Sequence, residues 1–216
     1  MKINVLLADD HDLVRTGLKN ILADVVDIYV VGEADSGEAA IAMANTYPID
    51  VILMDIRMPG MGGLKAIQAI QQQFPAIKII AITAYDEELL ASRLLQEGVM
   101  AYLTKGCSSE EVLQAIRKAY KGERYIDPLI ASQLAIQRAN DGDTSPVEVL
   151  SDRELQVMLM LVKGKNIQAI SETLNLSPKT INTYRYRLLE KLQVSSNVEL
   201  THLAIRHGLV KEASSS

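Results

Sequence analysis

The sequence predicts a doubly wound α/β domain with a five-stranded parallel sheet, followed by an all-α domain of four helices. Before residue 122, short apolar runs alternate five times with longer stretches of helical spacing. Parallel strands require crossover connections, and these are usually helices, so the alternation favours a parallel sheet covered on both faces. Beyond residue 148 the strand-like runs stop and only helical patterns remain. The 216 residues suffice for two domains that each bury a core.

The predicted strands are short runs rich in Val, Ile and Leu. They are Ile3–Ala8, Ile28–Glu33, Asp50–Met54, Ile77–Thr83 and Val99–Leu103. The helical patterns that follow them are Leu13–Ala23, Gly37–Thr46, Gly63–Gln73, Glu87–Glu97 and Ser108–Lys121. The first helix has Leu18, Ile21 and Leu22 on one face, and the last begins with a capping box of Ser108 and Glu111. We therefore expect the first domain to span residues 1–122.

Between the two domains, residues 123–148 are expected to form a linker with a helical segment to about Arg138. Residues 139–146 consist of turn-forming and polar residues, which is typical of a flexible connection. The second domain is expected at residues 149–211, with a short tail at 212–216. No internal repeat or long low-complexity segment interrupts this order.

The second domain contains four helical patterns and no strand signal. The patterns are Asp152–Lys163, Ile167–Leu174, Pro178–Leu192 and Asn197–His207. Capping boxes mark the start of the first and the last, since Ser151 precedes Glu154 by three residues and Ser196 precedes Glu199 by three. These start signals predict where both helices begin.

The composition excludes several classes of protein. With 48% hydrophobic and 23% charged residues, the chain is not disordered, and its apolar runs are far shorter than the ~20 residues of a membrane span. The N-terminal residues reach Asp9 and Asp10 without a long apolar run, so we expect no signal peptide. The single cysteine, Cys107, cannot form an internal disulfide or a cysteine-based metal site. We expect a cytoplasmic protein without a membrane partner.

Charge is divided unevenly along the chain. Residues 149–216 carry nine Lys or Arg and six Asp or Glu, a net charge of +3. The rest carries 13 basic and 21 acidic residues, a net charge of −8. A mildly basic C-terminal part on an acidic body points to a polyanion partner for that part.

Carboxylates and two other polar groups lie at the carboxyl ends of the predicted strands. Asp9 and Asp10 follow the first strand, Asp55 ends the third, Thr83 ends the fourth and Lys105 lies just beyond the fifth. In an open parallel sheet these ends line the binding crevice. Clustered carboxylates repel one another, and Mg²⁺ is the natural oxygen-liganded cation to compensate them. A carboxylate beside this cation, an ammonium and a hydroxyl can attack a phosphoryl donor.

Four motifs within residues 1–122 resemble those of the response-regulator receiver domain. They are Leu7-Ala8-Asp9-Asp10-His11, Leu53-Met54-Asp55-Ile56-Arg57-Met58-Pro59-Gly60, Ile82-Thr83-Ala84 and Tyr102-Leu103-Thr104-Lys105-Gly106. The resemblance implies a phosphoacceptor (Asp55), an Mg²⁺ site (Asp9, Asp10, Asp55 and the Arg57 carbonyl), two groups on the phosphoryl oxygens (Lys105 and Thr83) and an aromatic switch (Tyr102). Many receivers have proline after the lysine, whereas this chain has Gly106, which leaves the peptide geometry at 105–106 open.

A helix-turn-helix pattern occupies the middle of the second domain. Ser177 is a good N-cap and Pro178 a good first residue for the second helix of that pair. Apolar residues at helical spacing predict its core-facing side: Ile181, Tyr184, Leu188 and Leu192. The candidate base readers are Asn182, Thr183 and Tyr186, and the candidate phosphate contacts are Arg185, Arg187 and Lys191. Lys179 and Thr180 complete the expected DNA-binding set.

Three segments of the second domain resemble the LuxR-type helix-turn-helix: Leu150–Glu154, Ser177–Ile181 and Leu189–Leu192. Together the two halves resemble regulators of the NarL/FixJ type. More narrowly, Asp9–Gly17 and Ser177–Arg187 are similar to the GacA/UvrY/LetA group. The resemblance implies a two-component response regulator with a hybrid sensor histidine kinase of the BarA/GacS kind as phosphodonor. It also implies a homodimer when active and double-stranded DNA at promoters of small regulatory RNAs as target.

Two other functions fit parts of the pattern. A phosphohydrolase would turn over a phosphoaspartate on a small-molecule substrate, with the C-terminal helices as a lid, and would release phosphate in the steady state. An interaction adaptor would bind a partner helix through its tail, and salt-sensitive binding to duplex DNA separates it from a regulator. No G-x-x-x-x-G-K-[ST] occurs, and residues 59–63 do not form a G-x-G-x-x-G fingerprint.

Overall fold

The computed structural model describes residues 2–83, 94, 97–126, 149–174 and 176–206. The chain divides into two compact units, one within residues 1–131 and the other within 132–216. Most of the helix expected at Glu87–Glu97, residues 127–148 of the expected linker with its helical segment, and the C-terminal tail lie outside the described residues. Within the described residues, no helix is both long and apolar enough to cross a bilayer.

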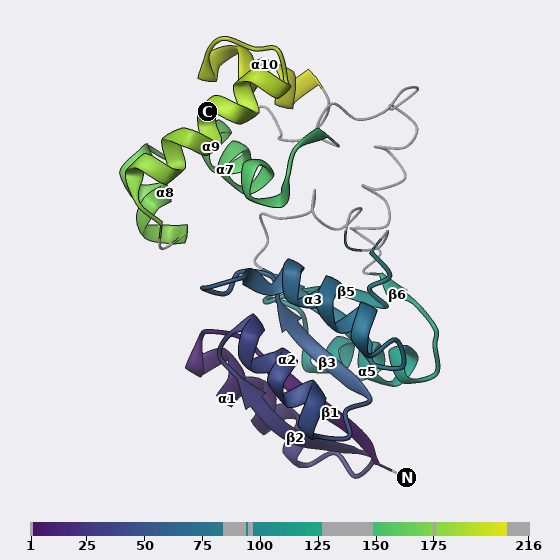
Figure 1. Cartoon of the computed structure of the whole chain (residues 1–216). Coiled ribbons are helices and arrows are strands. Elements are labelled where there is room, and N and C mark those ends of the chain that lie inside the picture. Colours follow the sequence, from purple (N-terminus) through teal and green to yellow (C-terminus); the bar gives the residue numbers. More distant parts are fainter. Residues whose placement is uncertain (1, 84–93, 95–96, 127–148, 175, 207–216) are drawn as a thin grey trace. The chain divides into compact units, whose positions relative to one another are not determined.

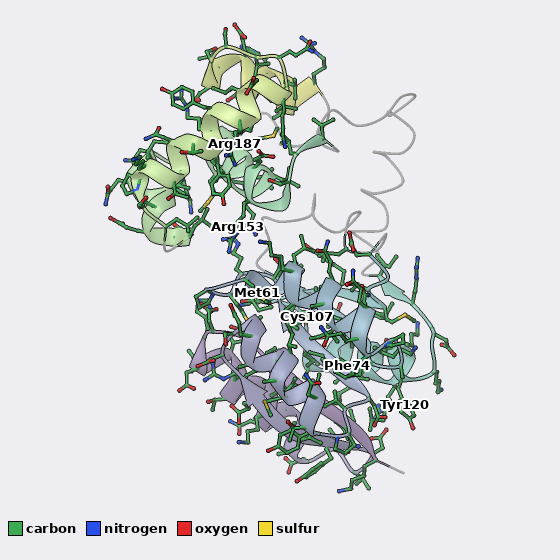
Figure 2. All side chains as sticks on the ribbon, in the orientation of Figure 1. Met61, Phe74, Cys107, Tyr120, Arg153 and Arg187 are labelled. Atoms are coloured by element: carbon green, nitrogen blue, oxygen red, sulfur yellow. The ribbon has the colours of Figure 1, made fainter. Side chains whose placement is uncertain are left out.

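The first unit contains a parallel sheet with the strand order β2-β1-β3-β4-β5-β6. The strands are β1 (Ile3–Ala8), β2 (Ile28–Ala34), β3 (Val51–Asp55), β4 (Lys78–Thr83), β5 (Ala101–Thr104) and β6 (Tyr125–Ile126). The chain order therefore reverses direction at β1, which makes the sheet doubly wound as expected. The loops after β3 and β5 lie at the same end of the sheet, as the positions of Met61 and Cys107 show (Figure 2).

The expectation of five strands is corrected by β6. Tyr125 and Ile126 pair in parallel with Ala101 and Tyr102 of β5, and the Tyr125 N–H donates to the Met100 carbonyl at 2.9 Å. These residues were expected in the linker, because a strand of two residues is too short to show any alternation. Pairing with β5 defines this strand, and it carries the sheet beyond residue 122.

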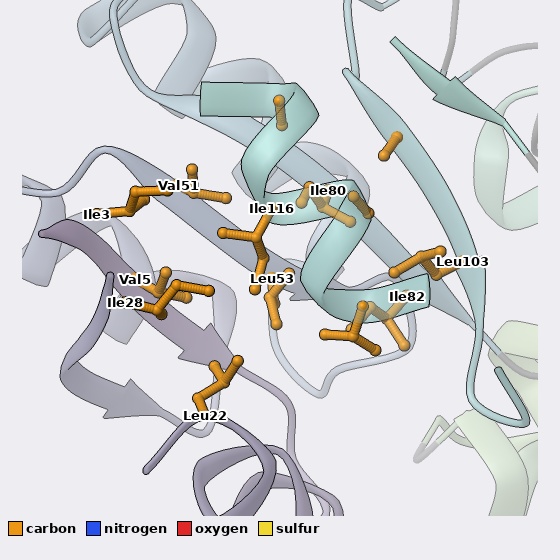
Figure 3. Close-up of a cluster of buried hydrophobic side chains, with 14 of the residues drawn as sticks. Ile3, Val5, Leu22, Ile28, Val51, Leu53, Ile80, Ile82, Leu103 and Ile116 are labelled. Atoms are coloured by element: carbon orange, nitrogen blue, oxygen red, sulfur yellow. The ribbon is translucent and has the colours of Figure 1, made fainter. Parts of the chain in front are cut away.

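Helices cover both faces of the sheet (Figure 1). They are α1 (Asp12–Ala23), α2 (Gly37–Thr46), α3 (Gly62–Gln73) and α5 (Ser109–Tyr120). The predicted capping box of α5 is confirmed, since the Ser108 hydroxyl accepts from the Glu111 N–H and the Glu111 carboxylate accepts from the Ser108 N–H. Helices α1 and α5 pack on one face through a cluster that includes Leu22, Leu53 and Ile116 (Figure 3).

The second unit is helical in its described residues, as predicted. Its helices are α7 (Asp152–Val162), α8 (Ile167–Leu174), α9 (Pro178–Lys191) and α10 (Asn197–Arg206). They share a core of buried side chains: Leu155, Met158, Ile170, Ile181, Leu188, Leu200 and Ala204. The capping box of Ser151 and Glu154 is confirmed. At α10, Ser196 accepts from the Glu199 N–H, but the Glu199 carboxylate binds the N–H of Ser195, one residue earlier than predicted.

Candidate functional site

Polar side chains cluster in the first unit at the ends of four neighbouring strands, the edge at which open parallel sheets have their binding crevice. Asp9 directly follows β1, Asp55 is the last residue of β3, Thr83 is the last of β4 and Lys105 directly follows β5. Adjacent parallel strands in register bring these ends to one edge of the sheet. The structure therefore gathers at this edge the residues that the sequence predicted there.

Lys105 joins the two buried carboxylates of the crevice. Its Nζ donates to Asp55 Oδ2 at 2.7 Å and forms an ion pair with Asp9 Oδ2 at 2.8 Å. Asp55 is 1% exposed and Asp9 3%, so both charges need compensation inside the protein. The Arg57 N–H donates to Asp55 Oδ1 at 3.0 Å, and the Lys105 N–H donates to the carbonyl of buried Thr83 at 2.7 Å.

The charges in the crevice shift one another's protonation. Burial and the neighbouring charge of Asp9 raise the pKa of Asp55 to about 6, although Lys105 and the Arg57 N–H act in the opposite direction. Burial alone would lower the pKa of Lys105, but its bonds to Asp55 and Asp9 outweigh burial and raise it. Lys105 therefore stays charged, and Asp55 is poised to lose its proton just below neutral pH.

A group of three aspartates and one histidine at this edge of the sheet is suited to a divalent cation. Asp9, Asp10, His11 and Asp55 each offer one ligand atom, and these atoms all lie within 4.8 Å of one another. Carboxylate oxygens are the donors that Mg²⁺ prefers. His11 was not among the predicted site residues, and its Nδ1 lies 3.1 Å from Asp9 Oδ1 and 2.8 Å from Asp10 Oδ1. A histidine beside a carboxylate pair could have drawn attention to it.

Close contacts hold the loop after β3. A Cβ on Gly63, at the start of α3, would lie 2.0 Å from the Asp55 carbonyl oxygen, so only glycine allows this approach. Glu38 in the first turn of α2 accepts a hydrogen bond from the Met61 N–H at 2.9 Å. The backbone that carries Asp55 is thus supported from two neighbouring helices.

The remaining predicted residues of the first unit are also located. Tyr102 is fully buried in β5, with Ala81 and Ile126 as its partners in the neighbouring strands. The peptide bond between Lys105 and Gly106 is trans, since no peptide bond among the described residues is cis.

Helix α9 presents an exposed stripe on the second unit. Ser177 caps the helix by accepting from the Thr180 N–H at 3.1 Å, as predicted. The stripe follows helical spacing and consists of Lys179, Asn182, Thr183, Tyr186 and Arg187, of which Asn182 is half-buried and the others are exposed. Tyr186 is 67% exposed, and Arg187 is labelled in Figure 2. Polar and basic side chains on the second helix of a helix-turn-helix suit contact with base edges and phosphates.

Two of the predicted DNA contacts bond to side chains of other helices, whereas Asn182 and Thr183 donate to carbonyls of α9 itself. Arg185 Nε donates to Asn197 Oδ1 of α10 at 2.9 Å. Lys191 Nζ lies 2.6 Å from Oε2 of buried Glu154 on α7. Thr180, which was also predicted to contact DNA, is half-buried, and its hydroxyl forms a hydrogen bond with the Ser177 hydroxyl at 2.8 Å. The exposed stripe is therefore narrower than the predicted list.

Comparison with known protein families divides the chain in the same way. Residues 5–117 match the family described as "Response regulator receiver domain". Residues 148–204 match the family described as "Bacterial regulatory proteins, luxR family". The chain is 50% identical over 209 residues to "Response regulator GacA" of Pseudomonas viridiflava, covering 96% of this chain and 98% of that protein. It is 51% identical over 208 residues to "Response regulator UvrY" of Escherichia coli K12, covering 96% and 95%.

Solved structures with the same two-part architecture are also similar. A structure of the RcsB response regulator of Salmonella typhimurium matches with a TM-score of 0.66 and 26% identity, over 93% of this chain and 96% of that one. RcsB of Salmonella enterica serovar Typhimurium, bound to promoter P1flhDC in the presence of phosphomimetic BeF3-, matches with a TM-score of 0.62 and 25% identity, over 95% and 99%.

Proposed function

This chain belongs to the LuxR-type response regulators, and we propose that phosphorylation of Asp55 by a sensor kinase controls how tightly its second domain binds specific DNA sites. The observation that carries this proposal is the contact of Lys105 with both Asp55 and Asp9 in a buried crevice. The near-complete match to GacA and UvrY supports a hybrid sensor histidine kinase of the BarA/GacS kind as phosphodonor and promoters of small regulatory RNAs as targets. A regulator of this kind works in the cytoplasm.

In the proposed transfer, a carboxylate oxygen of Asp55 attacks the phosphorus atom, and the bond from phosphorus to the donor's leaving group breaks. Asp9, Asp10, Asp55 and the Arg57 carbonyl would hold Mg²⁺, which when bound would supply neutralisation of the phosphoryl charge. Lys105 already sits 2.7 Å from Asp55, so it can shift its donor bonds to the new phosphoryl group. The chain accepts this group and slowly loses it, and we propose no other enzymatic activity.

The signal then has to reach the second domain. We propose that the Thr83 hydroxyl contacts the phosphoryl oxygens and that buried Tyr102 moves with it as the aromatic switch. The active form is proposed to be a homodimer, because paired helix-turn-helix modules read two half-sites about one DNA turn apart. Coupling of this kind needs two states that bind DNA differently.

The first test measures DNA binding against phosphorylation. The full chain is titrated with a duplex that carries a site recovered by genome-wide footprinting, with and without acetyl phosphate and Mg²⁺. Typical allosteric coupling of ~1–3 kcal/mol predicts binding that is roughly 5–150-fold tighter with the phosphodonor. Chelation of Mg²⁺ is the control and should remove the gain. Equal affinity in all conditions would contradict phosphorylation control, and steady-state phosphate release from metabolites would instead favour a phosphohydrolase.

The second test separates phosphate contacts from base contacts on α9. Lys179→Ala should weaken binding to all sequences alike and lower the slope of log K against log salt by about one. Asn182→Ala should cost roughly 1–3 kcal/mol, mainly at one base position. Affinities for the specific and a random duplex, each at several salt concentrations, provide the measurement. Equal losses on both duplexes for Asn182→Ala would remove that residue from the base readers.

A further inference from the structure

The guanidinium group of Arg15 contacts the backbone of the pair Asp9 and Asp10 and plays no part in the proposed transfer. Arg15 on α1 is 13% exposed, and its Nη1 donates to the carbonyl oxygen of Asp9 at 2.6 Å. Its Nη2 donates to Asp12 Oδ1 at 2.6 Å, and its Nε lies 3.6 Å from Glu33 Oε2. One side chain thus joins the loop after β1 to the end of β2.

These contacts complete the support of the Asp9 backbone. The Asp9 N–H donates to the Ala34 carbonyl at 3.0 Å, and Ala34 is the last residue of β2. The Asp9 carbonyl is held by Arg15, and the Asp9 carboxylate faces Lys105. With both peptide groups fixed, the direction in which the carboxylate leaves the backbone is fixed as well. The next residue, Asp10, continues from the carbonyl that Arg15 holds.

We propose that Arg15 is a positioning residue that orients the Asp9–Asp10 loop for a divalent cation. Arg15 does not touch the cation; it acts through the Asp9 carbonyl. The inference rests on the proposed Mg²⁺ site. Groups that orient metal ligands commonly change metal affinity by 10–100-fold when they are removed. The planar fork of arginine suits this role, because one group can hold the Asp9 carbonyl, Asp12 and Glu33 together.

The sign of the effect separates positioning from simple electrostatics. A cation near an acidic cluster repels a divalent cation, so removal of the Arg15 charge alone would tighten metal binding. Loss of loop orientation would weaken metal binding. Arg15→Gln removes both the charge and the fork, whereas Arg15→Lys keeps the charge and loses the fork.

The same helix offers a matched control. Lys19 Nζ lies 2.6 Å from Glu33 Oε1, so it shares this carboxylate with Arg15. Lys19 is 58% exposed, and its ion pair is with Glu33. Lys19→Ala therefore removes a nearby positive charge and a Glu33 contact without disturbing the contact that the proposal invokes.

The experiment measures Mn²⁺ affinity of the full chain by electron paramagnetic resonance of the free ion, without any phosphodonor. Arg15→Gln is expected to weaken binding about 10-fold, and Arg15→Lys by a smaller factor in the same direction. Lys19→Ala should stay within about twofold of the wild type, since loss of an exposed charge changes the field only slightly. Thermal unfolding of each variant gives its midpoint, and the affinities are measured at one temperature well below all midpoints. A variant that has lost only folding stability would then show an unchanged Mn²⁺ affinity.

The possible outcomes distinguish a failure of the positioning role of Arg15 from a failure of the proposed metal site. Wild-type affinity or tighter binding in both Arg15 variants would overturn the positioning role while leaving the metal site intact. If Arg15→Gln does not fold, Arg15→Lys decides alone. Failure of the wild type to bind Mn²⁺, or unchanged binding in Asp9→Asn, would overturn the proposed metal site itself.

Discussion

Replacement of Asp55 by alanine is expected to abolish covalent labelling of the full chain by acetyl phosphate, as measured by intact-protein mass spectrometry. Asp55 ends the central strand β3, is 1% exposed and has one carboxylate oxygen against Lys105. Asp10 is exposed. Asp9 has one carboxylate oxygen in contact with the His11 imidazole and the other in contact with the Lys105 ammonium. These differences support the proposal that Asp55 is the nucleophile and that Asp9 and Asp10 are metal ligands. Labelling that survives in Asp55→Ala but vanishes in Asp9→Ala would reverse these roles.

Asp55→Asn is the control for folding in that experiment. Because the pKa of Asp55 is raised to about 6, the folded protein holds this proton more tightly than the unfolded chain. Stability is therefore lost as the pH rises from about 4 through 6, and an ionised Asp55 costs roughly 3 kcal/mol at pH 7. The uncharged isostere should unfold in urea at no lower concentration than the wild type at pH 7. Loss of labelling in Asp55→Asn then reports chemistry and not unfolding.

The main residues of the crevice were predictable from the sequence because the parallel topology of the sheet determines which strand ends lie together. Once the strands are known, their carboxyl ends must meet, so Asp9, Asp55 and Lys105 had to come together. The supporting contacts were not predictable. Arg15 and Glu38 bind a backbone carbonyl and a backbone N–H across space. Backbone partners leave no sequence pattern, since every residue offers the same groups.

The sixth strand was missed for a related reason. A pattern of two residues has no period, and Tyr125–Ile126 becomes a strand only because β5 leaves its edge open to pairing. At α10, two serines precede the helix. The Ser196 hydroxyl accepts from the Glu199 N–H, whereas the Glu199 carboxylate accepts from the N–H of the neighbouring Ser195. The spacing in the sequence predicted Glu199 as the capping carboxylate, but it did not predict that the Ser195 N–H would be the donor.

On α9 the sequence separates an apolar side from a polar one but not a free cation from a paired one. Lys191 was predicted to contact DNA phosphate, yet its Nζ lies 2.6 Å from Glu154 Oε2. Glu154 is only 3% exposed and also accepts from the Ser151 N–H at 2.8 Å. Burial alone would raise the pKa of Glu154, but the bonds from Lys191 and Ser151 outweigh burial and lower it. The ion pair therefore stabilises the charged form and ties α9 to α7.

Lys191→Met is expected to destabilise the second domain by about 2 kcal/mol, measured by urea unfolding of the full chain at pH 7. Breaking a buried ion pair typically costs 3–5 kcal/mol, and the 41% exposure of the Lys191 side chain reduces this through solvent screening. Glu154→Gln should cost less, because it leaves no buried charge without a partner. Below pH ~4.5 Glu154 becomes protonated in the unfolded chain and the difference between wild type and Lys191→Met should shrink.

The exposed lysine at the start of the same helix provides the matched comparison. Lys179→Ala is expected to leave the urea midpoint within about 0.5 kcal/mol of the wild type while lowering the salt slope of DNA binding by about one. Lys191→Met should do the opposite, because its ammonium is engaged by Glu154 and has little to offer a phosphate. Both variants are measured on one duplex at several salt concentrations, at a temperature where each remains folded. A Lys191→Met protein with wild-type stability and a salt slope reduced by one would return this residue to the phosphate contacts that the sequence predicted.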